Sequence, residues 1–203
     1  RIVQLGGSCT GLPLESVYLT TKGVTDDDLE LLSDRRSLKV VSLRSSLITD
    51  RGLKHLLRLD QLWSLNLESC SITDEGLKQV ATLKNLTRLG LASTSVTDDG
   101  LRHLTPLKKL QELELPEAAK TDLGLKHYVA LVRPEKLDLQ KWFITDAGLA
   151  PLADQLQLVE LNLRNTPLNG SGLGYLTGLK QLQILTMSEN QMNEKEFKNL
   201  AEL

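Results

Sequence analysis

Three histidines are the first candidates for a metal site, because they recur at one position of a repeated pattern. His55, His103 and His127 each lie six residues after the threonine of a Thr-Asp pair. We expect His103 and His127 at equivalent heights on neighbouring helices, but packed helices lie about 8–10 Å apart and no third ligand shares their register. The pattern therefore predicts solvent-facing helix residues, with no bound metal or other cofactor.

Two further features have the residue types of catalytic or nucleotide sites. The segment Asn169–Gly174 is as glycine-rich as a phosphate-binding loop, but it lacks the lysine of a P-loop and falls on a degenerate copy of a repeated motif. Cys70 falls where a thiol can serve as a weak hydrogen-bond donor, because other repeats hold small polar residues there: Ser46, Thr94, Thr166 and Asn190. No nucleophile is placed with a histidine and an acid. We therefore predict that the protein is not an enzyme.

The composition argues against several classes of partner. The 203 residues include 24 Lys+Arg and 26 Asp+Glu, a net charge of −2, whereas nucleic acids and anionic membranes attract positive charge. No apolar run approaches the ~20 residues of a membrane-spanning helix, and the first residues do not resemble a signal peptide. Two cysteines cannot make a disulfide framework. We expect no nucleic-acid or membrane binding. The low number of cysteines favours a reducing cytoplasm over the alternative, a secreted or cell-envelope array, with which it is also compatible.

A strict period organises the chain. Thr-Asp pairs recur every 24 residues without insertion or deletion, at Thr25, Thr49, Thr73, Thr97, Thr121 and Thr145. Two degenerate copies, Asn169-Gly170 and Asn193-Glu194, extend the register to eight units. Internal repeats of this length are typical of solenoid proteins.

One unit predicts a strand, a turn and a short helix. Leu62, Leu65 and Leu67 spell L-x-x-L-x-L, whose period-2 ending indicates a strand. Thr73 is a suitable helix N-cap, and Asp74 would face the positive end of the helix dipole. Leu77, Val80 and Leu83 then mark one helical face of roughly two turns.

Stacking of these units predicts the architecture. A strand and a short helix cannot bury their leucines alone, so each unit must cover its neighbour. Strands stack about 4.8 Å apart while helices need about 8–10 Å, so the stack must bend with the strands inside. We predict an α/β fold, a right-handed horseshoe with parallel strands on the concave face. Residues 1–13 would form an N-terminal capping segment, and residues 14–203 one domain of about eight repeats.

The repeat L-x-x-L-x-L-x-x-T-x-I-T-D-x-G-L resembles the leucine-rich repeats of planctomycete-type bacterial arrays. It is also similar to a shortened form of the cysteine-containing repeats of F-box proteins. The opening Ile2–Ser8 resembles the capping segment that precedes such bacterial arrays. The resemblance covers almost the whole chain, and it implies a protein-interaction scaffold without chemistry of its own.

A glycine stands three residues after most of the threonines. The positions are Gly52, Gly76, Gly100, Gly124, Gly148 and Gly172, with Asp28 and Glu196 in the end units. Glycine inside a helix costs about 0.5–1 kcal/mol relative to alanine, so six in register need a reason. We expect the adjacent coil to approach too closely for any side chain.

The outward strand positions of units five and six supply a candidate partner site. Carboxylates gather there, and the same stretch departs from the repeat pattern at Pro116, Ala118, Lys120, Pro134 and Trp142. Departures from a local rule often mark functional sites. The candidate residues are Glu112, Glu114, Glu117, Glu135, Asp138, Gln140, Trp142 and Glu160, with Trp63 as a second aromatic. The alternative is drift in a tolerant repeat, with charge kept for solubility.

The sequence thus predicts a scaffold that binds a protein partner, one with a basic segment, on its concave strand face. A spacer or cap in a larger protein is the alternative, and a substrate-recognition array like those of F-box receptors is a third reading. The chain lacks the adaptor-binding helical motif that the third reading needs. Partner identity, oligomeric state and whether the chain is an excised fragment stay open.

Overall fold

The computed structural model describes residues 7–11, 13–191 and 195. The chain divides into two compact units, Arg1–Ala119 and Lys120–Leu203. Most of the expected capping segment lies outside the described residues, and so do Asn193-Glu194 and Glu196 of the eighth repeat. The division into a cap and a single repeat domain therefore stays a prediction.

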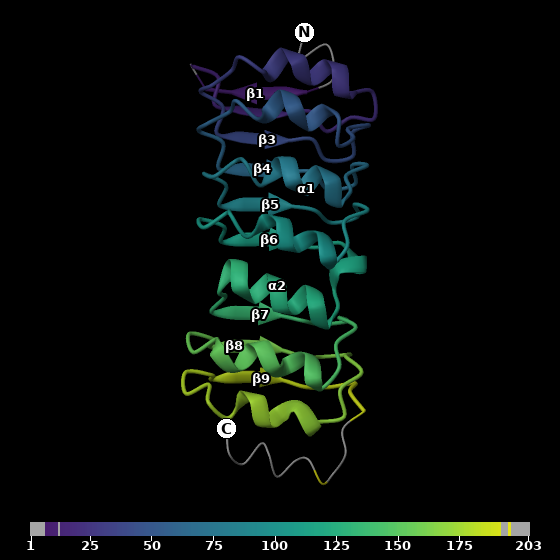
Figure 1. Ribbon diagram of the computed structural model, residues 1–203, viewed down its shortest axis with the longest axis vertical. Helices are drawn as coiled ribbons and strands as arrows, with labels where there is room; N and C mark the ends of the chain where they lie inside the picture. Colours follow the sequence, from purple (N-terminus) through teal and green to yellow (C-terminus); the bar gives the residue numbers. More distant parts are fainter. Residues whose placement is uncertain (1–6, 12, 192–194, 196–203) are drawn as a thin grey trace. The chain divides into compact units, whose positions relative to one another are not determined.

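The first unit contains a six-stranded sheet (Figure 1). Its first strand, β1 (Ser8–Thr10), runs antiparallel to β2 (Ser16–Tyr18). Parallel strands follow in chain order, each paired with the one before it: β3 (Val40–Ser42), β4 (Ser64–Asn66), β5 (Arg88–Gly90) and β6 (Glu112–Glu114). Paired residues such as Leu65 and Leu89 are one repeat apart, so the period in the sequence is the register of the sheet.

The second unit repeats this arrangement on a smaller scale. Its three-stranded parallel sheet consists of β7 (Lys136–Asp138), β8 (Glu160–Asn162) and β9 (Ile184–Thr186). Leu137 pairs with Leu161, which pairs with Leu185. The L-x-x-L-x-L pattern therefore produces the expected parallel strand in this unit too.

Short helical segments connect the strands, and in each unit they cover one face of the sheet (Figure 1). Only two of those described are α-helices, α1 (Asp74–Val80) and α2 (Asp122–Val132). The others are 3₁₀-helices: η2 (Asp26–Leu32), η3 (Gly52–Leu56), η4 (Asp99–Leu104), η5 (Glu117–Ala119), η6 (Ala147–Asp154) and η7 (Ser171–Leu176). The prediction of an ordinary helix in every unit was too general, since the tighter 3₁₀ form is the usual one in short segments. Among the described residues, no helix has the length and apolarity needed to cross a membrane.

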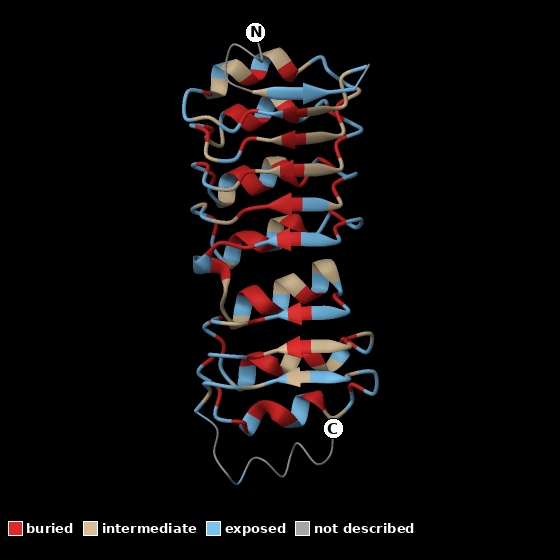
Figure 2. Ribbon diagram, turned by 180° about the vertical axis from the view of Figure 1, so that it is seen from behind, coloured by how far each residue is buried: buried red, intermediate tan, exposed pale blue. Residues whose placement is uncertain are grey.

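The core is built from the leucine positions that define the repeat. The middle residue of each strand from β2 to β8 is buried, and the strands are correspondingly red at this point in Figure 2. In the third repeat Leu62 and Leu65 are each 1% exposed, while Leu67 and Leu77 are fully buried. This burial confirms the predicted core face.

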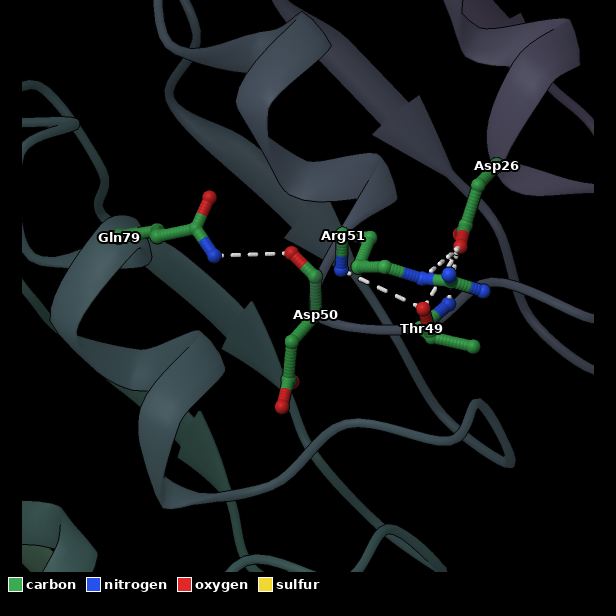
Figure 3. Close-up of polar contacts among 5 residues, drawn as sticks. All are labelled: Asp26, Thr49, Asp50, Arg51 and Gln79. Atoms are coloured by element: carbon green, nitrogen blue, oxygen red, sulfur yellow. Dashed lines mark hydrogen bonds and ion pairs between the residues drawn. The ribbon is translucent and has the colours of Figure 1, made fainter.

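The Thr-Asp pairs connect successive repeats. In Figure 3 the carboxylate of Asp26 accepts hydrogen bonds from the backbone N–H and the hydroxyl of Thr49 in the following repeat, at 2.8 and 2.6 Å. The same two bonds join Asp50 to Thr73, at 2.9 and 2.6 Å. They recur between Asp74 and Thr97 in the first unit, and between Asp122 and Thr145 in the second. We call this set of contacts the Asp–Thr ladder.

The ladder explains the glycines. A Cβ on Gly76 would lie 2.9 Å from a methyl carbon of Ile72 and closer still to the carboxylate of Asp50. A Cβ on Gly100 would lie 3.0 Å from the Cβ of Asp74 and would overlap its carboxylate. The expected close approach of the adjacent coil is thus present, and the nearest atoms belong to the ladder aspartates. In the repeat of Gly76, the Thr-Asp-x-Gly motif supplies an acceptor for the next repeat and leaves room for the aspartate of the previous one.

Candidate functional site

In both units the strand face opposite the helical segments carries polar side chains. The first and third residues of each strand point outward on this face, because side chains alternate along a strand. Register aligns them in columns, such as Ser64, Arg88 and Glu112 in the first unit. In the second unit the two columns are Lys136, Glu160 and Ile184, and Asp138, Asn162 and Thr186.

Opposite charges pair along these strand faces. Glu112, a predicted partner-binding carboxylate, lies 2.9 Å from the guanidinium of Arg88. Glu160, another, forms an ion pair with Lys136. Exposed pairs of this kind contribute at most about 1 kcal/mol each, but they neutralise charge that a partner could use. Further pairs join neighbouring repeats: Glu15–Lys39, Arg44–Glu68 and Arg164–Glu189.

Two predicted carboxylates form no ion pair with a described residue. Glu114, at the end of β6, is exposed, and its side chain makes no hydrogen bond or ion pair with any described residue. Asp138, at the end of β7, accepts hydrogen bonds only from uncharged groups, the backbone N–H of Gln140 and the side-chain amide of Asn162, at 2.9 and 3.0 Å. Within the described part of the chain, these two are the predicted site residues on the strands whose negative charge is uncompensated.

The remaining predicted carboxylates lie beside the strands. Glu117 begins η5, and its side chain is exposed. Glu135 precedes β7; its carbonyl accepts hydrogen bonds from the N–H groups of Val159 and Glu160, and its side chain is exposed. Neither lies in a strand column. The nine predicted residues also divide between the units, with Trp63, Glu112, Glu114 and Glu117 in the first and the others in the second.

Each unit has a shallow hollow on its strand face. The hollow of the first unit, about 130 Å³, lies between Asn66, Arg88 and Glu114, where Gly90 contributes no side chain. The hollow of the second unit is larger, about 350 Å³, and Asp138 and Glu160 both line it. The structure thus brings together two predicted residues in each hollow, Glu112 with Glu114 and Asp138 with Glu160.

Comparison with known proteins agrees with this geometry. An internalin (inlF) from Listeria monocytogenes matches with a TM-score of 0.58 and 22% identity, over 87% of this chain. The chain has a leucine-rich-repeat fold. Internalin C2 from the same organism also matches, with a TM-score of 0.39 and 25% identity over 78% of the chain. The chain spans 55% of the length of each internalin. No protein-family model matches the sequence, and no curated protein does either.

Trp63, the second predicted aromatic, contacts a charged residue of the next repeat in the sheet of the first unit. Its ring is half-buried, and the guanidinium carbon of Arg88 lies 5.5 Å from the ring centre. A cation over an aromatic ring is attracted to the electron-rich face of its quadrupole, by about 0.5–1 kcal/mol at exposed sites. Together with Glu112 this contact fixes the Arg88 side chain beside the first hollow.

Trp142, one of the predicted partner-binding residues, packs into the second unit. Its side chain is only 6% exposed, and its ring packs edge-on against Tyr128 of α2, with ring centres 6.0 Å apart. Burial also raises the pKa of Tyr128 above its ordinary value. The exposed aromatic is the next residue, Phe143, at 73%. Sequence reasoning missed it, although three repeats hold serine or proline at this position, Ser71, Ser95 and Pro167, and only Leu47 is another large apolar residue there.

The glycine-rich segment Asn169–Gly174, which resembles a phosphate-binding loop, already binds a carboxylate of the protein. Asp146 replaces the ordinary ladder contact by accepting three backbone N–H groups of the following repeat, from Asn169, Gly170 and Gly172, at 3.0, 3.0 and 2.8 Å. An internal carboxylate therefore takes the donors that a phosphate would need.

The histidines do not form a metal site in the described structure. His55 lies on η3, His103 on η4 and His127 on α2, and all three are half-buried rather than fully exposed to solvent. Among the described residues, no group of three His, Cys, Asp or Glu side chains could hold a metal ion.

Cys70 occupies the structural position expected of it. Its thiol is 3.0 Å from the carbonyl oxygen of Leu43 and 3.6 Å from the hydroxyl of Ser46. Burial raises the pKa of the Cys70 thiol, against smaller opposing effects of its hydrogen bonds with Ser46. Ser46 and Thr166, at the same position of other repeats, instead donate to the carbonyl three residues earlier in their own repeat.

We therefore expect the two thiols to react very differently. Cys9 is exposed on β1, whereas Cys70 is buried and burial raises the pKa of its thiol. Because the thiolate is the nucleophile, Cys70 should react with Ellman's reagent at pH 7.5 at least about a hundredfold more slowly than Cys9. A Cys9→Ser variant should retain only the slow phase until urea unfolds the protein. Equal rates in the native protein would contradict the placement of Cys70.

Proposed function

We propose that this chain is a non-enzymatic protein-interaction scaffold whose strand face binds a partner through a basic segment. The observation that carries the proposal is the pair of uncompensated carboxylates, Glu114 and Asp138, one beside each hollow. Other strand-face charges, such as those of Glu112 and Glu160, are neutralised by a neighbouring repeat. The charges left free are negative, so a positive group on the partner is the complementary choice.

The strand face is suited to binding because its side chains are already held in place. Asn66 accepts a hydrogen bond from the backbone N–H of Glu68, and Asn162 accepts the same bond from Arg164. Side chains fixed before binding lose less conformational entropy when a partner arrives. This reasoning supports a scaffold over a spacer, which would need no ordered polar face.

We also propose that the repeats are of the type found in planctomycete-type bacterial arrays, on the basis of the Thr-Asp-x-Gly-Leu motif. A receptor role like that of F-box proteins is the weaker reading. It would require an adaptor-binding motif that this sequence does not show.

The test is affinity capture from lysate of the source organism with three forms of the protein. The first is the native chain, and the second reverses the free charges, Glu114→Lys with Asp138→Lys. The matched control makes the same change in net charge elsewhere, Asp34→Lys with Asp154→Lys. Both aspartates are exposed, and neither side chain forms a hydrogen bond or ion pair with a described residue. We expect the native chain and the control to capture the same partner, and the strand-face variant to capture at least about tenfold less.

Each outcome is decisive. Equal capture by all three forms would leave a binder and remove the strand-face site. Loss in both variants would show that net charge, rather than these positions, governs binding. Capture by none would favour the spacer reading. Circular dichroism and a urea unfolding midpoint confirm that each variant is folded.

A further inference from the structure

The hollow of the second unit is a small grid of side chains with an acidic end and an apolar end. Lys136 and Asp138 come from β7, Glu160 and Asn162 from β8, and Ile184 from β9. Asp138 and Ile184 stand two strands apart, about 9.6 Å, and two residues apart along the strands, about 6.6 Å, so their backbones are separated by about 12 Å. A guest that uses both ends must be long, apolar along its length and charged at one tip.

The acidic end has one open oxygen. Both described donors to Asp138, the N–H of Gln140 and the amide of Asn162, bond to its Oδ1 atom. Oδ2 accepts no hydrogen bond from any described residue. Asp138 lines the hollow. The two bonds to Oδ1 hold its carboxylate in one orientation, so a donor that binds Oδ2 would meet a group that is already ordered.

The apolar end is the side chain of Ile184, which is 52% exposed although it stands in a strand column. The corresponding positions on β7 and β8 are charged and paired with each other, Lys136 with Glu160. Ile184 therefore offers the hollow an uncovered hydrocarbon surface next to polar neighbours. Contact with methylene groups would remove that surface from water.

The charges that line the hollow determine which charge a bound group must carry. Within the hollow Lys136 and Glu160 neutralise each other, which leaves the single negative charge of Asp138. An anion would meet that charge directly. A metal ion would need several ligands, and the described residues contain no group of three side chains that could supply them. A positively charged organic group is the remaining match.

The geometry points to a lysine side chain of the partner as the guest of this hollow, with its ammonium group on Oδ2 of Asp138 and its methylenes on Ile184. Lysine buries its hydrocarbon stem and keeps its charge at the tip. Arginine fits less well, because its guanidinium prefers two parallel bonds to both oxygens of a carboxylate, and Oδ1 is already occupied. This inference rests on the proposed function and names the group that the strand face recognises.

The experiment is a titration followed by ¹H–¹⁵N correlation spectra of the intact chain. The probe is acetyl-Ala-Lys-Ala-amide, compared with the same peptide carrying norleucine, which has the stem but no charge, or arginine. We expect saturable shifts in the amides of β7, β8 and β9 with the lysine peptide, about tenfold weaker affinity with norleucine, and weaker affinity with arginine. Absence of saturable shifts, equal affinity for norleucine or tighter binding of arginine would overturn the assignment.

Variants separate the two ends of the hollow. Asp138→Asn keeps an oxygen for Gln140 and Asn162 but loses the charge, and it should weaken the lysine peptide about tenfold. Ile184→Ala should weaken it by a smaller factor, about threefold, and equally for the norleucine peptide. The matched control, Asp154→Asn on η6, should leave binding unchanged. Equal effects of Asp138→Asn and Asp154→Asn would show attraction to overall charge and would overturn the site.

The titration and the lysate capture can fail independently. A partner captured through Glu114 and Asp138 without any binding of the lysine peptide would keep the proposed function and remove this inference. Binding of the peptide with no partner captured would keep the hollow as a lysine site and remove the scaffold role.

Discussion

Replacing Gly100 by alanine is expected to lower the free energy of unfolding by about 2 kcal/mol. The new Cβ would lie 3.0 Å from the Cβ of Asp74 and would overlap its carboxylate, which must then move. Movement breaks the two hydrogen bonds that Asp74 accepts from Thr97, and bonds to charged groups contribute about 1.5–3 kcal/mol each. The better helix propensity of alanine returns only about 0.5–1 kcal/mol.

Gly174 provides the matched control. It lies in η7, another 3₁₀ segment, but a Cβ there would meet no other atom within 4 Å. Gly174→Ala should therefore leave stability unchanged or raise it by up to about 1 kcal/mol. Urea unfolding followed by circular dichroism measures both variants. If Gly100→Ala behaved like Gly174→Ala, the ladder would not be the reason for the repeated glycine.

A double-mutant cycle isolates the contact. Asp74→Ala alone should cost about 2 kcal/mol, because Thr97 loses the acceptor for its N–H and its hydroxyl. In that background the carboxylate is gone, and Gly100→Ala should cost little more. We expect an interaction energy of about 1–2 kcal/mol, whereas independent sites would add within about 0.5 kcal/mol.

The fold could be predicted from the sequence because the 24-residue spacing of the repeat sets which residues of neighbouring strands pair. A leucine every 24 residues, as at Leu65 and Leu89, becomes a pair of neighbours in a parallel sheet, and burial follows from that register. The helix type could not be read in this way. Thr73 caps α1 as predicted, accepting from the N–H of Glu75, but the same motif begins a 3₁₀-helix at η4. In segments this short, the last hydrogen bonds rather than the pattern decide between the two forms.

The role of the aspartates was missed because it lies between repeats. Asp74 was expected to act on its own helix dipole, and it does stand in the first turn of α1. Its hydrogen bonds, however, reach Thr97 in the next repeat. The signal was present in the sequence, since threonine, aspartate and glycine recur together. Spacing within one repeat does not show that the glycine makes room for an aspartate 26 residues earlier, as Gly100 does for Asp74.

The candidate site could be predicted from the sequence only in part. Arg88 and Glu112 stand in one column one repeat apart, so their ion pair follows from the register and could have been anticipated. The free Oδ2 atom of Asp138 could not have been anticipated, because it depends on the orientation of the Asn162 side-chain amide. Side-chain orientation is set by local packing, and a repeat pattern gives the position of a residue without giving its rotamer.

Trp142→Ala is expected to destabilise the second unit by about 3–5 kcal/mol, the usual cost of deleting a buried tryptophan side chain. Trp142 is 6% exposed and packs edge-on against Tyr128, a geometry that contributes about 0.5–1.5 kcal/mol beyond the burial itself. The position elsewhere holds a small polar residue such as Ser46 or Thr166. Because the rest of this unit is packed around an indole, alanine would leave a cavity that the backbone cannot close.

The neighbouring aromatic separates this structural role from a binding role. Phe143 is 73% exposed, so Phe143→Ala should change the free energy of unfolding by less than about 0.5 kcal/mol. Trp142→Phe, which keeps a ring in the cavity, should recover more than half of the loss. Both are measured by urea unfolding followed by circular dichroism. A Trp142→Ala variant that stayed stable but lost a captured partner would support a binding role for Trp142. A destabilised Trp142→Ala variant, together with an unchanged Phe143→Ala variant, would show that this departure from the repeat serves the core of the second unit.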